Sequence, residues 1–322
     1  MNKIIEIINR NSTFLITTHI NPEGDAIGSE LALFLILKKL GKKAMILNSD
    51  TVPLIYRFLP HSEAIVVSNP ELVSGLSGDY DVLFIVDCGD LERTGLRIEG
   101  IRGKIAVIDH HITSKPFGDH SWIEPSASST GEMIYELAVS LGVNIDTDIA
   151  INLYTCILTD TGSFRYSSTT PKALKIAGLL LEKGIDPWRV TEEVYESQSL
   201  NRIRLLGMVL SKIEISDDGK IAWIVVTQDM YRDTATTAED TENFANYPRA
   251  IRDVDVSIFF RELENGRFKI SFRSKGHIDV SAVAQIFGGG GHHNAAGCVI
   301  EAGLDDAKRM VISAVENIIR SV

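Results

Sequence analysis

The sequence predicts an α/β protein: a doubly wound, mainly parallel sheet joined by a helical connector to a smaller α+β domain. Three observations lead to this prediction. Residues 105–108 are all apolar, as in a parallel strand that helices cover on both faces. Strand-like and helix-like segments alternate through the first part of the chain, which is the pattern of a doubly wound sheet. Beyond residue 213, strands follow one another with a hairpin turn at residues 264–266, which indicates a different fold.

The first domain is expected to span residues 1–187. Its strands are predicted from short, largely apolar segments at 14–19, 43–48, 82–86 and 104–108. Helical spacing of apolar residues predicts helices near 26–40, 129–141, 148–158 and 171–183. Ser129 and Glu132 have capping-box spacing at the start of the second helix, and Gly41 and Gly184 end the first and the last.

Two further segments complete the chain. From about residue 187 to residue 213 the pattern is continuously helical and amphipathic, so residues 188–213 are interpreted as a connector. Residues 214–322 are interpreted as the second domain, with strands predicted at 221–226, 254–260 and 267–273.

The composition limits the class of protein. With 322 residues, 44% of them hydrophobic, the chain is long enough for two domains with cores of their own. No apolar run approaches the ~18 residues of a membrane span, and residues 1–10 lack the apolar core of a signal peptide. Cys88, Cys156 and Cys298 are far apart, so free thiols in a reducing cytoplasm are expected. The net charge of -11 argues against long duplex nucleic acid as a partner, but a small anionic substrate fits if metal ions supply positive charge.

Acidic and histidine side chains follow strands or a helix at four places in the first domain. Because the carboxyl ends of parallel strands share one edge of a sheet, we expect these loops to meet there. A single aspartate after a strand is usually an ordinary turn residue, but four such loops together favour a site. The residues are His19, Glu23 and Asp25 in the first loop, Asp87 in the second, Asp109, His110 and His111 in the third, and Asp160 in the fourth.

The residue types indicate the kind of metal. Carboxylates with a minority of imidazoles suit a hard divalent cation such as Mn²⁺ or Mg²⁺. A thiolate zinc site is disfavoured because the three cysteines do not cluster. The ligands also exceed the need of one ion, whereas two ions that share a bridging carboxylate would use them and would activate a water for attack on a phosphoryl group.

Taken in order, these segments resemble the motifs of the DHH phosphoesterase superfamily. The matching runs are His19-x-x-Pro-x-Gly-Asp25-Ala-x-Gly-Ser29, Val86-Asp87-Cys88, Asp109-His110-His111 and Thr159-Asp160-Thr161-Gly162. In the second domain, Arg273-Ser-Lys-Gly276 and Gly288-Gly-Gly-Gly-His292-x-x-Ala295-Ala-Gly297 resemble the DHH-associated substrate domain. Together, and at this length, they are similar to the NrnA-type branch, which comprises nanoRNA exonucleases that also dephosphorylate 3′-phosphoadenosine 5′-phosphate.

The resemblance implies a role for each residue of the first domain. His111 would contact the scissile phosphate, and Asp109 would hold a neighbouring histidine in its tautomer. Asp87 would bridge the two ions, with Mn²⁺ expected ahead of Mg²⁺. Glu23 stands where the superfamily usually has an aspartate, which bears on metal spacing or preference rather than on the reaction class. The implied metal ligands are His19, Glu23, Asp25, Asp87, His110 and Asp160.

In the second domain, the resemblance places the glycine run against the nucleotide. Consecutive glycines permit close backbone approach, so several N–H groups can face an anion. The alternative is a tight turn before a strand at 298–300. Arg165, which follows Asp160, is explained nearly as well as an exposed loop residue. The expected substrate-binding residues are Arg165, Arg273, Ser274, Gly289, Gly290, Gly291 and His292.

The sequence is therefore interpreted as a cytoplasmic two-metal phosphoesterase that hydrolyses very short single-stranded RNA and 3′-phosphoadenosine 5′-phosphate, with a homodimer suggested by relatives. Alternatives among enzymes are a linear or cyclic dinucleotide phosphodiesterase, a RecJ-like exonuclease for long strands and a family II type pyrophosphatase. The length of the chain disfavours the RecJ-like exonuclease, and the glycine loop disfavours the family II type pyrophosphatase. An alternative from a different class is a catalytically silent nucleotide-binding sensor, against which the complete ligand set argues.

Overall fold

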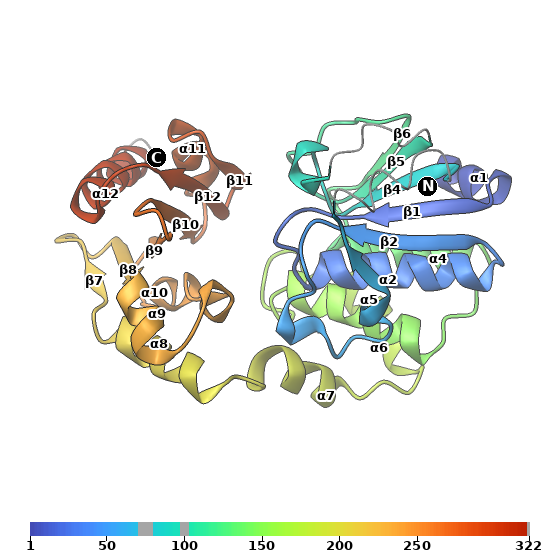
Figure 1. Cartoon of the computed structure of the whole chain (residues 1–322), viewed down its shortest axis with the longest axis horizontal. Coiled ribbons are helices and arrows are strands. Elements are labelled where there is room, and N and C mark those ends of the chain that lie inside the picture. Colours follow the sequence, from blue (N-terminus) through green and yellow to red (C-terminus); the bar gives the residue numbers. More distant parts are fainter. Residues whose placement is uncertain (70–79, 97–102, 321–322) are drawn as a thin grey trace. The chain divides into compact units, whose positions relative to one another are not determined.

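The computed structural model describes residues 1–69, 80–96 and 103–320, apart from the side chain of His292 (Figure 1). The chain divides into two compact units, residues 1–197 and 198–322, each with a six-stranded sheet of its own. This confirms the predicted α/β part and the second, smaller α+β part. A separate connector at residues 188–213 stays a prediction.

All strands of the sheet in the first unit are parallel. Their order is β3-β2-β1-β4-β5-β6, so the chain winds outward from β1 to one edge and then from β4 to the other. Ligands of such folds bind at the carboxyl ends of strands where the winding reverses, which here is between β1 and β4. The strands are β1 Thr13–Thr17, β2 Lys43–Asn48, β3 Ile65–Val67, β4 Val82–Val86, β5 Lys104–Asp109 and β6 His120–Ile123.

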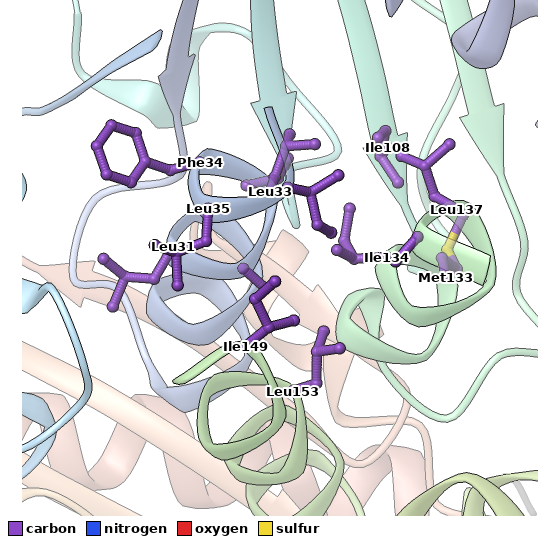
Figure 2. Packing of buried hydrophobic residues seen from close by; sticks show 14 of the residues in the cluster. Leu31, Leu33, Phe34, Leu35, Ile108, Met133, Ile134, Leu137, Ile149 and Leu153 are labelled. Atoms are coloured by element: carbon purple, nitrogen blue, oxygen red, sulfur yellow. The ribbon is translucent and has the colours of Figure 1, made fainter. Parts of the chain in front are cut away.

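The helix α2 is the centre of the main core. It contacts β1, β2 and β4 as well as α4 and α5, and it is therefore buried from Gly24 to Leu37. Figure 2 shows apolar side chains of α2, α4 and α5 packed together with Ile108 of β5. Successive strand residues alternate between the faces of the sheet, so Phe14 joins this core and Leu15 joins a smaller one. The helices of this unit are α1 Asn2–Arg10, α2 Gly24–Lys39, α4 Thr130–Ser140, α5 Thr147–Asp160, α6 Pro171–Leu181 and α7 Pro187–Thr191.

A glycine sets the distance between α2 and α5. A Cβ atom on Gly28 would lie 2.6 Å from the carbonyl oxygen of Asn152, so a side chain has no room there. The helices are also close where the first turn of α2, which carries Asp25, meets the last turn of α5, which carries Asp160, because a Cβ on Gly24 would lie 2.6 Å from Oγ1 of Thr159.

Two features differ from the sequence-based expectation. The edge strands β3 and β6 were not predicted: β3 is apolar but only three residues long, and β6 is half-exposed with polar and apolar residues mixed. The expectation of one continuous helix over 187–213 is wrong, because α8 (Leu200–Leu210) starts anew after a π turn at Glu192–Glu196. The Ser199 hydroxyl accepts the N–H of Arg202, and serines that cap in this way compete with a continuous helix.

The second unit has a mixed sheet in the order β11-β12-β10-β9-β8-β7, in which only the pairing of β8 with β9 is parallel. The helices α11 and α12 pack on one core of this unit, and α8 and α9 on another. No helix within the described residues is long and apolar enough to cross a membrane. The remaining elements are β7 Glu214–Ile215, β8 Ile221–Val226, α9 Gln228–Thr234, α10 Asn246–Arg249, β9 Val256–Glu262, β10 Phe268–Ser274, α11 Val280–Ile286, β11 Gly290–His292, β12 Ala295–Ile300 and α12 Leu304–Arg320.

Candidate metal centre

The loops after β1, β4 and β5 bring His19, Asp87 and residues 109–111 to the carboxyl edge of the parallel sheet. Asp87 begins its loop with a φ of 54°, an unusual conformation for a residue other than glycine. Its N–H still donates to the carbonyl oxygen of Ile108 at 2.9 Å, so the turn stays tied to β5. Such uncommon backbone conformations concentrate at functional sites.

Asp25 is held by the start of α4. Its Oδ2 accepts the N–H of Thr130 at 2.6 Å, and its Oδ1 accepts the N–H of Gly131 at 2.9 Å. The hydroxyl of Ser29, one turn along α2, donates to Oδ1 at 3.1 Å. A helix N-terminus offers unpaired N–H groups and favours a negative charge, so α4 fixes this carboxylate in one orientation.

His110 lies at the centre of the cluster. Its Nε2 is 3.5 Å from Oδ2 of Asp160 and 3.7 Å from both Oδ2 of Asp25 and Oδ1 of Asp87. Its Nδ1 lies 3.2 Å from the carbonyl oxygen of Ala127, which can only accept a hydrogen bond. Nδ1 therefore carries a proton, and Nε2 is the nitrogen that points at the three acids.

The two oxygens of Asp87 face different partners. Oδ1 accepts the hydroxyl of Thr130 at 3.0 Å and lies on the His110 side of the carboxylate. Oδ2 lies 3.8 Å from Nε2 of His19. The Nδ1 atom of His19 lies 2.8 Å from the carbonyl oxygen of Ile20, so this histidine also turns its Nε2 toward the acid.

His111 stands beside His110, with a centroid separation of 4.9 Å between the two rings. Its Nδ1 lies 2.5 Å from Oδ1 of Asp109, a fully buried carboxylate at the end of β5. Through this hydrogen bond Asp109 engages Nδ1 of the His111 ring.

The groups of the cluster shift one another's pKa values. Burial and the charge of Asp87 raise the pKa of Asp25 well above its usual value, and burial raises the pKa of Asp160 to about 7. Burial lowers the pKa of His110, but the carboxylates around it outweigh that effect and raise it to about 9. Burial raises the pKa of Asp87, but hydrogen bonding and charge from the histidines outweigh it and lower the pKa. A cation that bound here would therefore displace protons.

The donor set fits a divalent cation. Two groups of three donors each lie close enough to share an ion: Asp87, His110 and His111, and Asp25, His110 and Asp160. Donors that bind one ion at about 2.1 Å lie about 3–4 Å apart, as the atoms around Nε2 of His110 do. Within the described parts of the chain, no lysine or arginine forms an ion pair with these three carboxylates; their charged neighbours are histidines, and a divalent cation would add positive charge.

The structure gathers most of the predicted metal ligands but not all of them. His19, Asp25, Asp87, His110 and Asp160 converge as described above. Glu23 occupies the N-cap position of α2, is exposed, and belongs to neither of the two donor groups. Its charge nevertheless contributes to the raised pKa values of His19 and Asp160, so it lies near the rim of the cluster.

Arg165 is exposed, and an unusual turn at residues 162–164 separates it from Asp160. Gly162, Ser163 and Phe164 have consecutive φ values of 56°, 61° and 60°, and Nε of Arg165 donates to the carbonyl oxygen of Gly162 at 2.6 Å. The turn is therefore left-handed throughout, which is costly for serine and phenylalanine.

The predicted residues of the second unit lie on β10, on β11 and just before β11, and β12 separates these two strands in the sheet. The hydroxyl of the buried Ser274 donates to the carbonyl oxygen of Ile278 at 2.7 Å, so it is engaged within the fold. Arg273 is half-buried on β10. Gly290 and Gly291 form β11 with His292, whose side chain lies outside the described part, and a Cβ on Gly289 would lie 2.6 Å from Cβ of Cys298.

Sequence reasoning missed Thr130. Its N–H holds Asp25 and its hydroxyl holds Asp87, so one residue links two of the acids. The available signal was its position directly after Ser129, the N-cap of α4, where N–H groups need acceptors from elsewhere.

Comparisons with known proteins agree with this architecture. Residues 13–159 match the N-terminal domain of the DHH family, and residues 219–321 match the DHHA1 domain. The chain is 36% identical over 302 residues to the bifunctional oligoribonuclease and PAP phosphatase NrnA of Thermus thermophilus, which covers 93% of this chain and 88% of that protein. NrnA of Bacillus subtilis is 29% identical over 312 residues, 96% of each protein. The crystal structure of an exopolyphosphatase-related protein from Bacteroides fragilis matches with a TM-score of 0.92 at 30% identity, over 98% of this chain and 95% of that one.

Proposed function

The chain belongs to the DHH family and carries a DHHA1 domain, and from that membership we propose that it is a metal-dependent phosphoesterase acting on very short RNA and on 3′-phosphoadenosine 5′-phosphate. Relatives named as bifunctional oligoribonucleases and PAP phosphatases match it along most of their length, which supports both substrates. The acid and histidine cluster supports the reaction class.

The orientation of Asp87 is the observation that carries the proposal. Its Oδ1 faces Nε2 of His110 at 3.7 Å, and its Oδ2 faces Nε2 of His19 at 3.8 Å. A carboxylate with one oxygen toward each of two imidazoles is disposed to bridge two cations. We therefore assign Asp87 as the bridge between two divalent ions, with Mn²⁺ as the expected metal. The other assigned ligands are His19, Glu23, Asp25, His110 and Asp160.

The residues of the site divide the work of the reaction. Divalent cations, when bound, neutralise phosphate charge and activate the water that attacks phosphorus. The backbone carbonyls of Ile20 and Ala127 accept from Nδ1 of the two ligating histidines, so that each offers Nε2. We assign His111 to donate from Nε2 to a phosphate oxygen, and Asp109 to hold its ring in place through Nδ1.

The second unit is proposed to bind the substrate. Arg273 offers a guanidinium for a phosphate, and the residues from Gly289 to Gly291 carry no side chains of their own that would keep a ligand from their backbone. Few phosphates would be gripped at once, in keeping with a net charge of -11. Three buried free thiols are in keeping with the predicted cytoplasmic location. The homodimer expected from the family stays a prediction.

A product analysis tests the proposal. Purified protein with Mn²⁺ is given 5′-labelled RNA of two, five and about twenty nucleotides, 3′-phosphoadenosine 5′-phosphate, a cyclic dinucleotide, and pyrophosphate. Fast loss of the two shortest RNAs and release of phosphate from the nucleotide are expected. Preference for the longest RNA would favour a RecJ-like exonuclease, and turnover of pyrophosphate or the cyclic dinucleotide alone would overturn the substrate assignment while retaining the metal site.

A further inference from the structure

The carboxylate of Asp109 is fully buried and has a partner on each oxygen. Oδ1 accepts from Nδ1 of His111 at 2.5 Å. Oδ2 accepts from the hydroxyl of Ser114. Ser114 reaches this position because the chain turns back after β5, with its N–H donating to the carbonyl oxygen of His111 at 3.2 Å. The hydroxyl, the carboxylate and the imidazole therefore form one connected row.

The loop after β4 closes on this row. Gly89 lies two residues beyond Asp87, and a Cβ atom there would overlap the hydroxyl of Ser114 and lie 3.4 Å from Oδ2 of Asp109. A side chain at this position would therefore displace the Ser114 hydroxyl from its place beside Asp109. The loop that carries Asp87 therefore passes close to the Ser114 hydroxyl and the Asp109 carboxylate.

Fixing both oxygens of a carboxylate removes its freedom to rotate. Asp109 with Oδ1 alone engaged would still turn about its side-chain bonds and carry the imidazole with it, whereas a second donor locks the plane of the carboxylate. Buried networks whose members are all hydrogen-bonded are rigid in this way, and a buried oxygen left without a donor is costly.

We propose that Ser114 is a positioning residue that acts through Asp109 to aim Nε2 of His111 at the phosphate of the substrate. The proposal rests on the proposed function, in which His111 contacts that phosphate. In this role Ser114 contacts Asp109 rather than the substrate or a metal, so its removal is expected to slow turnover without weakening metal or substrate binding to the same degree.

The test compares Ser114→Ala with Ser114→Thr, which keeps the hydroxyl. Ser121→Ala is the matched control, because Ser121 is also half-buried in the first unit and its hydroxyl donates to the carbonyl oxygen of Phe117 at 2.6 Å, away from Asp109. For a two-nucleotide RNA, Ser114→Ala is expected to lower kcat by roughly 10–100-fold, as loss of such supporting hydrogen bonds does. KM and Mn²⁺ occupancy are expected to change much less, and Ser114→Thr to restore most of the rate.

A readout without turnover separates this proposal from the proposed function. The Nδ1 proton of His111, held in a short hydrogen bond, is followed by NMR in the intact protein. Ser114→Ala is expected to shift or broaden this resonance and Ser121→Ala to leave it unchanged, whether or not RNA is a substrate. An unchanged resonance, a kcat within about twofold of wild type, or an equal loss of kcat in Ser121→Ala would overturn the role of Ser114.

Discussion

Asp87 is the residue on which the proposed reaction depends most, because it alone faces both His19 and His110. We expect Asp87→Ala to lower kcat/KM for a two-nucleotide RNA by at least about 100-fold, in line with the loss of a major electrostatic contribution at the reacting phosphate. Nucleotide binding, measured by calorimetry, is expected to survive in part. Asp90→Ala in the same loop is the control, since the carboxylate of Asp90 accepts the nearby N–H of Glu92 at 2.9 Å and is in neither of the two donor groups. Turnover within tenfold of wild type in Asp87→Ala would refute the bridging role.

Glu30 is a fully buried acid that the metal cluster does not use. Its Oε1 accepts from Nδ2 of Asn48 at 2.7 Å, while its Oε2 and Oδ1 of Asn48 find no hydrogen-bond partner among the residues that the structure describes. Both of these atoms are acceptors when Glu30 is ionised, but a proton on Oε2 makes the two side chains complementary. Burial raises the pKa of Glu30 to about 8, and the Asn48 hydrogen bond and the charge of His19 offset only part of that effect.

This raised pKa makes stability depend on pH. The pKa of Glu30 in the unfolded chain is near its usual 4.5, so its contribution is fully present below pH 4.5 and is lost as pH rises to about 8. Each pH unit in this window removes about 1.4 kcal/mol, for a total of the order of 5 kcal/mol. Glu30→Gln keeps an acceptor for Asn48 and adds a donor. We expect it to remove this pH dependence and to be more stable than wild type at pH 8.

Urea unfolding at pH 5, 7 and 8.5, with chelator present so that metals do not contribute, measures this difference. The exposed Glu264 gives the control, as Glu264→Gln should follow the wild-type curve. Equal pH slopes in wild type and Glu30→Gln would show that Glu30 folds in its ionised form.

Sequence reasoning reached the acids and histidines of the site but not the residues that hold them. Asp87 and His110 directly follow strands, so their place on the sheet edge is fixed by strand polarity alone. Thr130 and Glu30 act through tertiary contacts that no local spacing encodes, because each partner lies far away in the chain. The exposure of Glu23 was equally hidden, since a motif position does not tell which way an N-cap side chain turns.

At the scale of elements, the contact between α2 and α5 sets the geometry of the site. Gly28→Ala places a Cβ 2.6 Å from the carbonyl oxygen of Asn152, and the backbone of a helix cannot yield as a side chain can. We expect it to lower the free energy of unfolding by about 1–3 kcal/mol, as overpacking does. Because α2 carries Asp25, weaker Mn²⁺ binding is expected as well.

Gly178→Ala is the matched control for this substitution. Gly178 also lies inside a helix, α6, but it is exposed and a Cβ there would meet no atom within 4 Å. Its replacement should stabilise the protein by about 0.4–1 kcal/mol through helix propensity. Urea unfolding and Mn²⁺ titration of the two variants are the measurements. Equal effects of the two alanines would mean that α2 and α5 can move apart without a loss of unfolding free energy.

The elements that the sequence predicted best are those with a buried, periodic pattern. The four central strands and α2, α4, α5 and α6 were all expected within about three residues of their bounds, because burial on the sheet imposes a clear apolar period. The edge strands β3 and β6 lack that burial. The break before α8 depends on the cap of Ser199, which an amphipathic pattern over residues 187–213 conceals.

At the scale of the whole molecule, the net charge of -11 limits how much nucleic acid the protein can hold. A binding surface for long strands collects many phosphate contacts, and each contact to single-stranded nucleic acid steepens the slope of log K against log salt by about 0.7. A protein that contacts only the first few phosphates shows a shallow slope. The slope no longer steepens once the substrate is longer than the segment that the protein contacts.

The salt dependence of turnover separates short-RNA hydrolysis from processive degradation. We expect log(kcat/KM) to fall with log[KCl] with a slope of about -0.7 to -2, equivalent to one to three phosphate contacts. The slopes for five and for about twenty nucleotides should agree, because the additional phosphates of the longer RNA remain in solvent. The measurement is kcat/KM for both RNAs across a KCl series at saturating Mn²⁺, with a two-nucleotide RNA as the reference for a single contact. A slope that steepens with RNA length would reveal an extended binding surface despite the acidic composition, and would favour the RecJ-like alternative over the short-substrate enzyme.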